Sequence, residues 1–190
     1  MILDGVLPFA RLLIEKTVSN TNYFVDATAG NGQDTLFLAN LAGEDGHVFA
    51  FDVQKQAIQN TRDRLEQAGM SDHVSLFHAG HEHGQALIPD SYHGKLNAAI
   101  FNLGYLPKGD KSLITKPDTT IEAIRQLFEM LKPGGLIVLV IYHGHAGGAD
   151  ERDAVTAYAA SLDQQAAHVM QYGFINQVNT PPFIVAIEKR

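Results

Sequence analysis

The chain has 190 residues, which is enough for one domain to bury a core without disulfides or bound metal. It contains no cysteine, which excludes disulfides, thiolate zinc sites and thiol nucleophiles and is typical of a reducing compartment. Its net charge of −7 argues against nucleic-acid binding through overall charge, although a local basic patch can still bind phosphates.

The pattern of charge and hydropathy predicts neither a targeting segment nor a membrane segment. Residues 1–10 carry Asp4 and lack a basic region followed by a long apolar run, so we expect no signal peptide. The longest apolar run, Leu136–Tyr142, is too short to cross a bilayer and is typical of a buried strand. We therefore expect a cytoplasmic protein with a single domain over residues 1–190.

Hydrophobic periodicity predicts strands and helices that alternate along most of the chain. In chain order we expect a helix at Pro8–Val18, a strand at Tyr23–Asp26, a helix at Asp34–Asn40, a strand at His47–Phe51, a helix through Ala57 to Leu65, strands at Val74–His78 and Asn97–Phe101, a helix at Thr119–Leu131, a strand at Leu136–Ile141, a helix at Arg152–Ala160, and an antiparallel pair at His168–Phe174 and Phe183–Glu188. This alternation is typical of an α/β fold in which a mostly parallel, seven-stranded sheet carries helices on both faces.

Polar residues follow the ends of the predicted strands. They are Asp26, Asp52, His81 with Glu82, Asn102, and His143 with His145. Ligands of open α/β sheets bind beyond the carboxyl ends of the strands, where the strand order reverses. We therefore expect these residues to meet at one site.

The first predicted strand leads into a turn with two glycines, Gly30 and Gly32, which let the backbone approach a ligand closely. Asp52 lies roughly 20 residues further on, where a carboxylate can accept hydrogen bonds from ribose hydroxyls. A dinucleotide site has a third glycine and places a pyrophosphate at the helix N-terminus, whereas this chain has Gln33-Asp34-Thr35 there. Because a carboxylate suits a cationic ligand, we expect S-adenosylmethionine rather than NAD.

The stretch Asn102-Leu103-Gly104-Tyr105 has the spacing of the Asn-Pro-Pro-Tyr motif of methyltransferases that act on exocyclic amines. The Asn102 side-chain carbonyl can accept hydrogen bonds from an amine and aim its lone pair at the methyl carbon. A neutral amide also favours the unreactive ammonium form less than a carboxylate does. Tyr105 offers a flat face on which a flipped-out base can stack. The alternative is a turn with a buried tyrosine.

Two histidines follow the strongest predicted strand. His143 or His145 can remove the proton released on methylation, or can bind a phosphate or a uracil edge. Alternatively, both lie in a solvated loop. A second group, His78, His81 and His83, lacks the spacing of a metal site, and strand alternation points its members to different sides, so we expect no metal.

The best local basic patch comprises Lys108, Lys111 and Lys116. We expect it near the mouth of the site, in contact with RNA phosphates. A solvated loop explains the same residues equally well.

Six stretches occur in order: Asp26-Ala-Thr-Ala-Gly-Asn-Gly-Gln-Asp-Thr35, Asp52-Val-Gln54, Gly80-His-Glu82, Asn102-Leu-Gly-Tyr-Leu-Pro107, Lys132-Pro-Gly-Gly135, and Tyr142-His-Gly-His145 with Gly147-Gly148. Together they resemble one small family, the YtqB-like proteins labelled rRNA methylases, which are associated with tRNA methyltransferases of the MnmM group. The resemblance covers nearly the whole chain. It implies a Rossmann-like, class I S-adenosylmethionine-dependent methyltransferase that converts 5-aminomethyluridine at the tRNA wobble position to 5-methylaminomethyluridine. Gln33 departs from the pattern, where histidine is expected in many relatives.

The resemblance also assigns residues to the parts of the site. The cofactor set is Asp26, Thr28, Ala29, Gly30, Asn31, Gly32, Asp34, Thr35, Asp52, Val53, Gln54, His81, Glu82, Asn102 and Leu103. Within it, the glycine turn with Asp34 and Thr35 would hold the methionine portion, Asp52 the ribose, and Val53 and Gln54 the adenine. The catalytic set is Asn102, Tyr105, His143 and His145, and the substrate set is Tyr105, Leu106, Pro107, Lys108 and Lys111.

Two other functions remain open at this stage. The same cofactor site can serve a methyltransferase of rRNA or of a small-molecule amine, and the acidic net charge slightly favours the small molecule. A regulatory protein that only binds S-adenosylmethionine needs no amine acceptor, so the Asn102–Pro107 motif argues against it. The family resemblance implies that the catalytic domain itself, alone or as a homodimer, grips the tRNA anticodon stem-loop.

Overall fold

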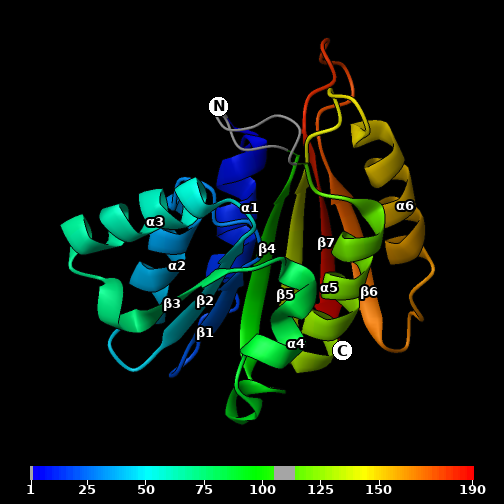
Figure 1. The fold of residues 1–190 in the computed structure, drawn as a ribbon. Coiled ribbons are helices and arrows are strands. Elements are labelled where there is room, and N and C mark those ends of the chain that lie inside the picture. Colours follow the sequence, from blue (N-terminus) through cyan, green and yellow to red (C-terminus); the bar gives the residue numbers. More distant parts are fainter. Residues whose placement is uncertain (1, 105–113) are drawn as a thin grey trace.

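The computed structural model describes residues 2–104 and 114–190, which form a seven-stranded sheet in the order β3-β2-β1-β4-β5-β7-β6 (Figure 1). The strands are β1 (Tyr23–Asp26), β2 (His47–Asp52), β3 (Val74–His78), β4 (Leu96–Leu103), β5 (Leu131–Ile141), β6 (Ala167–Tyr172) and β7 (Phe183–Lys189). Neighbouring strands from β3 to β5 are parallel, whereas β7 runs antiparallel to both β5 and β6. The predicted α/β fold of the Rossmann-like class is therefore confirmed.

Helices cover both faces of this sheet. They are α1 (Val6–Glu15), α2 (Gln33–Ala42), α3 (Lys55–Ala68), α4 (Gly84–Leu87), α5 (Pro117–Met130) and α6 (Gly148–Ala160). Figure 1 shows α1, α2 and α3 on one face and α4, α5 and α6 on the other. Three short 3-10 turns, at 71–73, 81–83 and 90–92, join these layers.

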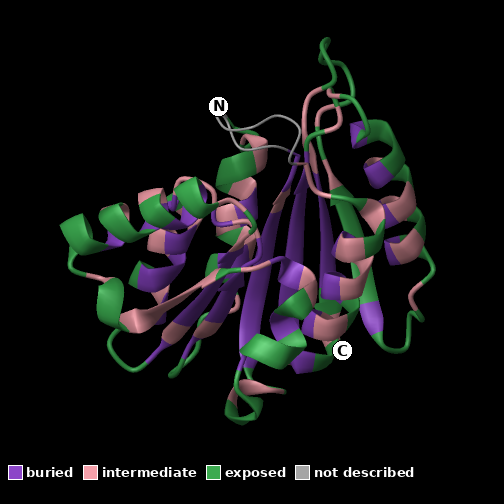
Figure 2. Ribbon diagram, in the orientation of Figure 1, coloured by how far each residue is buried: buried purple, intermediate pink, exposed green. Residues whose placement is uncertain are grey.

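Each face of the sheet packs its own hydrophobic cluster. One cluster joins Leu127 of α5 and Val155 of α6 to the strands, and the other joins Ile14 of α1 and Leu38 of α2 to the opposite face. The central strands are therefore buried on both sides, as Figure 2 shows, and read as continuous apolar runs in the sequence.

The strand order reverses between β1 and β4, because the chain leaves β3 at one edge and returns on the other side of β1. The carboxyl ends of the parallel strands meet beside this point, where α/β sheets bind ligands. A hydrogen bond joins the two segments there, since the main-chain N–H of Asn102 donates to Thr28 Oγ1 at 2.7 Å.

Most elements differ from their predicted bounds by a few residues, and α1, β5 and α6 show the clearest shifts. Helix α1 begins at Val6 rather than Pro8, because a proline in the first turn of a helix has no hydrogen bond to lose. Strand β5 already begins at Leu131, and a register shift against β4 accommodates residues 132–135. Helix α6 begins at Gly148, and α4 is too short for its periodicity to be recognised.

Within residues 2–104 and 114–190, every helix falls short of the length and hydrophobicity that a membrane span requires.

Candidate active site

A cavity of about 1100 Å³ opens at the carboxyl ends of the parallel strands. Its wall contains most of the predicted site residues: Thr28, Ala29, Gly30, Asn31, Asp34, Asp52, Val53, Gln54, His81, Glu82, Asn102, Leu103, His143 and His145. A cavity of this size can enclose a small-molecule cofactor together with part of a second reactant. The structure thus brings together residues from the carboxyl ends of five strands, β1 to β5.

The turn after β1 is held by both β2 and α3. The N–H of Gly30 donates to Asp52 Oδ2 at 2.9 Å, and the Gly30 carbonyl accepts a hydrogen bond from Thr61 Oγ1 at 3.2 Å. Gly32 has a φ of 74°, and a Cβ built on it would lie 2.8 Å from the main-chain Cα of Thr61. Only glycine fits there without displacing α3.

Asp52 ends β2 and exposes its carboxylate to the cavity. The N–H of Gln54 donates to Asp52 Oδ1 at 2.8 Å, while Oδ2 accepts the bond from Gly30. Burial raises the pKa of the Asp52 carboxyl, and these two N–H bonds oppose that rise. Because each carboxylate oxygen can accept more than one hydrogen bond, Asp52 retains capacity for the hydroxyls of a ribose.

Three predicted cofactor residues, Asp26, Gly32 and Thr35, do not line the cavity. The Asp26 side chain is completely buried, and its Oδ2 accepts a hydrogen bond from Thr35 Oγ1 at 2.6 Å. The N–H of Thr28 donates to Asp26 Oδ1 at 3.1 Å. Asp26 and Thr35 thus support the turn from behind, and a role of Asp26, Gly32 and Thr35 in cofactor binding stays a prediction.

Asp26→Asn is expected to weaken the pH dependence of stability. Burial, followed by the charge of Asp34, raises the pKa of the Asp26 carboxyl to about 7. Since the folded protein then binds this proton more tightly than the unfolded chain, Asp26 lowers the free energy of unfolding as pH rises from about 4 to about 7. The loss amounts to roughly 4 kcal/mol and should disappear in the variant. Urea unfolding at pH values on both sides of this window measures it.

The matched control is Asp45→Asn, at an exposed position between α2 and β2. This control should preserve the pH dependence of the wild-type protein. The same dependence of the free energy of unfolding on pH in Asp26→Asn and the wild type would contradict a raised pKa of the buried Asp26 carboxyl.

A chain of polar contacts connects α1 to the end of β4. Arg11 Nε and Nη2 both donate to Asp34 Oδ1, at 3.1 and 2.8 Å. Asn102 Nδ2 donates to the other oxygen, Asp34 Oδ2, at 3.0 Å. Because a carboxylate can only accept hydrogen bonds, the Asn102 amide must turn its nitrogen toward Asp34.

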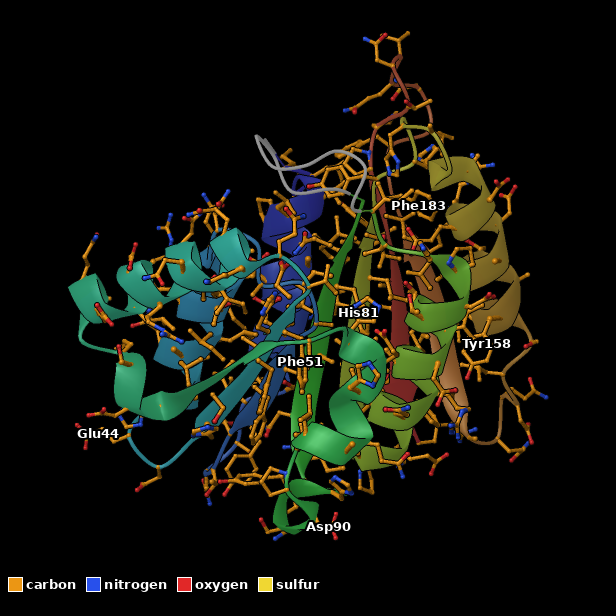
Figure 3. The ribbon with its side chains drawn as sticks, viewed as in Figure 1. Glu44, Phe51, His81, Asp90, Tyr158 and Phe183 are labelled. Atoms are coloured by element: carbon orange, nitrogen blue, oxygen red, sulfur yellow. The ribbon has the colours of Figure 1, made fainter. Side chains whose placement is uncertain are left out.

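His81 lies in the turn after β3, near the middle of the molecule (Figure 3). Its Nδ1 donates to the Ala27 carbonyl at 3.0 Å, and its ring packs edge-on against Phe101. Burial lowers the pKa of His81, so the ring is neutral at pH 7. Glu82, the next residue, adds a carboxylate to the cavity wall.

The loop after β5, the strand next to β4, brings His143 and His145 to the cavity wall. The His143 ring packs edge-on against Phe183, at 5.6 Å between centroids, and Figure 3 labels Phe183 in this region. Within the described part of the chain, the buried Nδ1 of His143 has no hydrogen-bond partner. His145 packs closely on Gly148, where a Cβ would lie 2.9 Å from His145 Nε2.

The substrate residues predicted from the sequence fall mostly outside the described residues. These are Tyr105, Leu106, Pro107, Lys108 and Lys111, whose roles stay predictions. Lys116, the third lysine of the predicted patch, is exposed and lines the cavity. Gly104 and Thr115 flank residues 105–113 and bind each other, since Thr115 N–H donates to the Gly104 carbonyl at 3.1 Å and Gly104 N–H donates to Thr115 Oγ1 at 3.0 Å.

Among the residues that the structure describes, no group of three or more His, Asp or Glu side chains is placed to hold a metal ion. The three histidines that cluster in sequence have separate surroundings. His78 Nε2 contacts the Val53 carbonyl at 3.0 Å, and His81 Nδ1 contacts the Ala27 carbonyl. His83 Nε2 lies 3.7 Å from Glu82 Oε1.

Several cavity residues were not predicted as site residues from the sequence, among them Leu7, Arg11, Thr115, Thr119, Asn179 and Thr180. Asn179 and Thr180 have φ values of 67° and 47°, which is unusual for a β-branched residue such as threonine. Arg11 belongs to the polar side of an amphipathic helix, and no local pattern distinguishes it from other exposed arginines.

The cavity suits a cationic cofactor that carries a ribose. Asp34, Asp52 and Glu82 place three carboxylates on its wall, and the glycine turn allows close approach of the backbone. Asp34 at the start of α2 is unfavourable for a pyrophosphate. The fold and the cavity together define an S-adenosylmethionine-dependent methyltransferase. The sequence model of the family described as "Putative rRNA methylase" matches residues 48–188, and the chain belongs to this family.

Individual relatives agree with this assignment. A protein from Arabidopsis thaliana named tRNA (mnm(5)s(2)U34)-methyltransferase, chloroplastic, is 35% identical over 188 residues, which is 95% of this chain and 68% of that protein. A crystal structure of a putative rRNA-methylase from Clostridium thermocellum is 41% identical, with a TM-score of 0.95 and coverage of 100% of both chains. A putative methyltransferase from Streptococcus mutans, solved in complex with SAH, is 39% identical, with a TM-score of 0.88 and coverage of 99% of both chains.

Proposed function

We propose that the protein methylates the exocyclic amine of 5-aminomethyluridine at the wobble position of tRNA, which yields 5-methylaminomethyluridine. The observation that carries the proposal is the Asn102 amide, a neutral acceptor on the wall of the cofactor cavity. An acceptor without charge suits an amine that must react in its unprotonated form. The name of the Arabidopsis relative supports a tRNA wobble uridine as the substrate.

The cofactor would lie along the ends of β1 and β2. The turn at residues 28–32 would hold the methionine portion, Asp52 would accept hydrogen bonds from the ribose hydroxyls, and Val53 and His81 would border the adenine. When bound, S-adenosylmethionine supplies a methyl group whose bond to sulfur breaks, with the electron pair staying on sulfur, as the nitrogen lone pair forms the new bond.

The protein then has two tasks beyond binding the cofactor. Asn102 orients the amine so that its lone pair points at the methyl carbon, because alignment is the main requirement of an in-line displacement. The methylated nitrogen must also release a proton. We assign this step to His143 or His145, both of which line the cavity.

RNA would approach over the mouth of the cavity. Lys116 is exposed there and can contact a phosphate, which supports a nucleic-acid substrate despite the net charge of −7. We extend this contact to Lys108 and Lys111, and we assign Tyr105 to stacking on the flipped-out base.

The proposal is tested by incubating the purified protein with labelled S-adenosylmethionine and bulk tRNA from a strain that lacks the gene. Nucleosides are then identified by mass spectrometry. Gain of 5-methylaminomethyluridine at the expense of 5-aminomethyluridine is expected. Intact binding of SAH without transfer to tRNA would contradict the proposed substrate, and it would direct the search to rRNA and small-molecule amines.

Asp52→Ala is expected to weaken the binding of SAH about 30-fold, because hydrogen bonds to a charged acceptor are lost and the turn at Gly30 loses its anchor. Isothermal titration calorimetry measures the affinity. Asp63→Ala, at an exposed position on α3, is the matched control and should bind SAH normally. Equal affinities of Asp52→Ala and the wild type would remove Asp52 from the ribose site.

A further inference from the structure

We propose that Arg11 and Asp34 are positioning residues that set the orientation of the Asn102 amide. The inference deepens the proposed function, on which it rests for the identity of the amine. It also gives a role to Arg11, a residue of α1 that lies outside the glycine turn and outside the Asn102 motif.

The geometry divides the Asp34 carboxylate between two partners. Oδ1 accepts two bonds from the Arg11 guanidinium, at 3.1 and 2.8 Å, and Oδ2 accepts one bond from Asn102 Nδ2, at 3.0 Å. An amide has nearly the same shape in its two orientations, so only its partners decide which end faces a ligand. Arg11 donates to Oδ1 of Asp34, so Oδ2 is the oxygen that accepts the bond from Asn102. This bond turns the Asn102 nitrogen toward Asp34 and away from the substrate.

The remaining atom of the amide is then available to the substrate. In the part of the chain that the structure describes, no residue donates a hydrogen bond to Asn102 Oδ1, although Asn102 lines the cavity. The main chain of Asn102 is also fixed, because its N–H donates to Thr28 Oγ1. The oxygen is therefore presented as an acceptor in a defined place, as alignment of an amine requires.

Arg11 also balances the charge of Asp34. An unbalanced carboxylate so close to the substrate amine would stabilise the ammonium form, which has no lone pair to react. Asp34 also interacts electrostatically with Asp26 at the end of β1 and with Tyr142 after β5, and neither of these groups carries a positive charge. Within the described residues, Arg11 is thus the cation paired with Asp34.

The experiment compares Arg11→Met, Arg11→Lys and Asp34→Asn in steady-state kinetics over a range of pH. We expect Arg11→Met to lower kcat about 10-fold near neutral pH and Asp34→Asn to lower it about 30-fold. KM for tRNA should stay within about 3-fold of the wild type in both variants, and SAH affinity should stay within about 3-fold in Arg11→Met. The kcat profile of Arg11→Met should shift to higher pH, and Arg11→Lys should recover part of the loss. Arg125→Met is the matched control, since Arg125 also pairs with a carboxylate, that of Glu122, and neither residue lines the cavity.

Two results would overturn the inference. One is unchanged kcat in both Arg11→Met and Asp34→Asn. The other is a loss of SAH affinity in Arg11→Met as large as its loss of kcat, because the pair would then act on the cofactor. A readout that needs no substrate is the NMR signal of the Asn102 side-chain amide, which should shift in Asp34→Asn. If wild-type protein fails to methylate 5-aminomethyluridine, the proposed function fails, while an unshifted amide signal counts against the positioning role alone.

Discussion

Asn102→Ala is expected to lower kcat on tRNA that contains 5-aminomethyluridine about 100-fold, with little change in SAH affinity. The substitution removes the amide to which we assign the orientation of the amine. It keeps the main-chain bond from residue 102 to Thr28, so the end of β4 should stay in place. The loss therefore belongs to the chemical step. Single-turnover kinetics with saturating cofactor and calorimetry with SAH measure the two quantities separately.

Two further variants sharpen this test. Asn102→Asp puts a second carboxylate beside Asp34 and favours the ammonium form of the amine, so its turnover should be low at neutral pH and should recover in part at higher pH. Asn40→Ala, on the exposed side of α2, removes an amide that donates to the Leu36 carbonyl and should leave turnover unchanged. Turnover of Asn102→Ala close to that of the wild type would remove the amide from the mechanism.

The fold was predictable from the sequence because its central strands are buried on both faces. β1 and β3 were predicted with their observed bounds, and the run at 136–141 marks the buried part of β5. Such strands read as short continuous apolar runs between glycine-rich turns. One error lies at residues 132–135, which belong to β5 although they contain Pro133 and two glycines, and which a register shift against β4 accommodates.

The site was only partly predictable, because topology tells which strand ends meet but not where each side chain points. Asp26 and Asp52 both end a buried strand and are followed by a turn, so the sequence pattern treats them alike. In the structure β1 lies between β2 and β4, and Thr28 and Thr35 enclose the Asp26 carboxylate. Asp52 opens on the cavity instead. The difference arises from packing between distant segments.

Contributions from distant elements left no local signal at all. Arg11 reaches Asp34 from a helix that precedes the first strand, and Thr180 reaches the cavity from the connection between β6 and β7. Both residues sit in segments whose local pattern is explained by an amphipathic helix or a proline-containing turn. Their place in the site depends on contacts across the fold, which neither periodicity nor motif spacing encodes.

Glu151→Ala is expected to lower the free energy of unfolding by about 3 kcal/mol, measured by urea denaturation. Glu151 lies in the first turn of α6 but is only 2% exposed. Its two oxygens accept hydrogen bonds from Thr115 Oγ1 at 2.5 Å and from Thr120 Oγ1 at 2.7 Å. Truncation would leave two hydroxyl groups without their acceptor and a cavity beneath α5 and α6.

The consequence should reach the active site, because Thr115 also accepts the N–H bond of Gly104, two residues after Asn102. In Glu151→Ala, Thr115 loses its acceptor and no longer fixes that end of β4, so kcat/KM should fall together with the free energy of unfolding. Glu151→Gln keeps one acceptor oxygen and should lower both quantities less. Asp150→Ala distinguishes the contribution of these hydrogen bonds to stability from that of the helix dipole. Asp150 occupies the same first turn but is exposed, and its removal should cost about 0.5 kcal/mol. Equal losses for Asp150→Ala and Glu151→Ala would mean that the dipole, and not the two threonines, explains the acidic residue at this position.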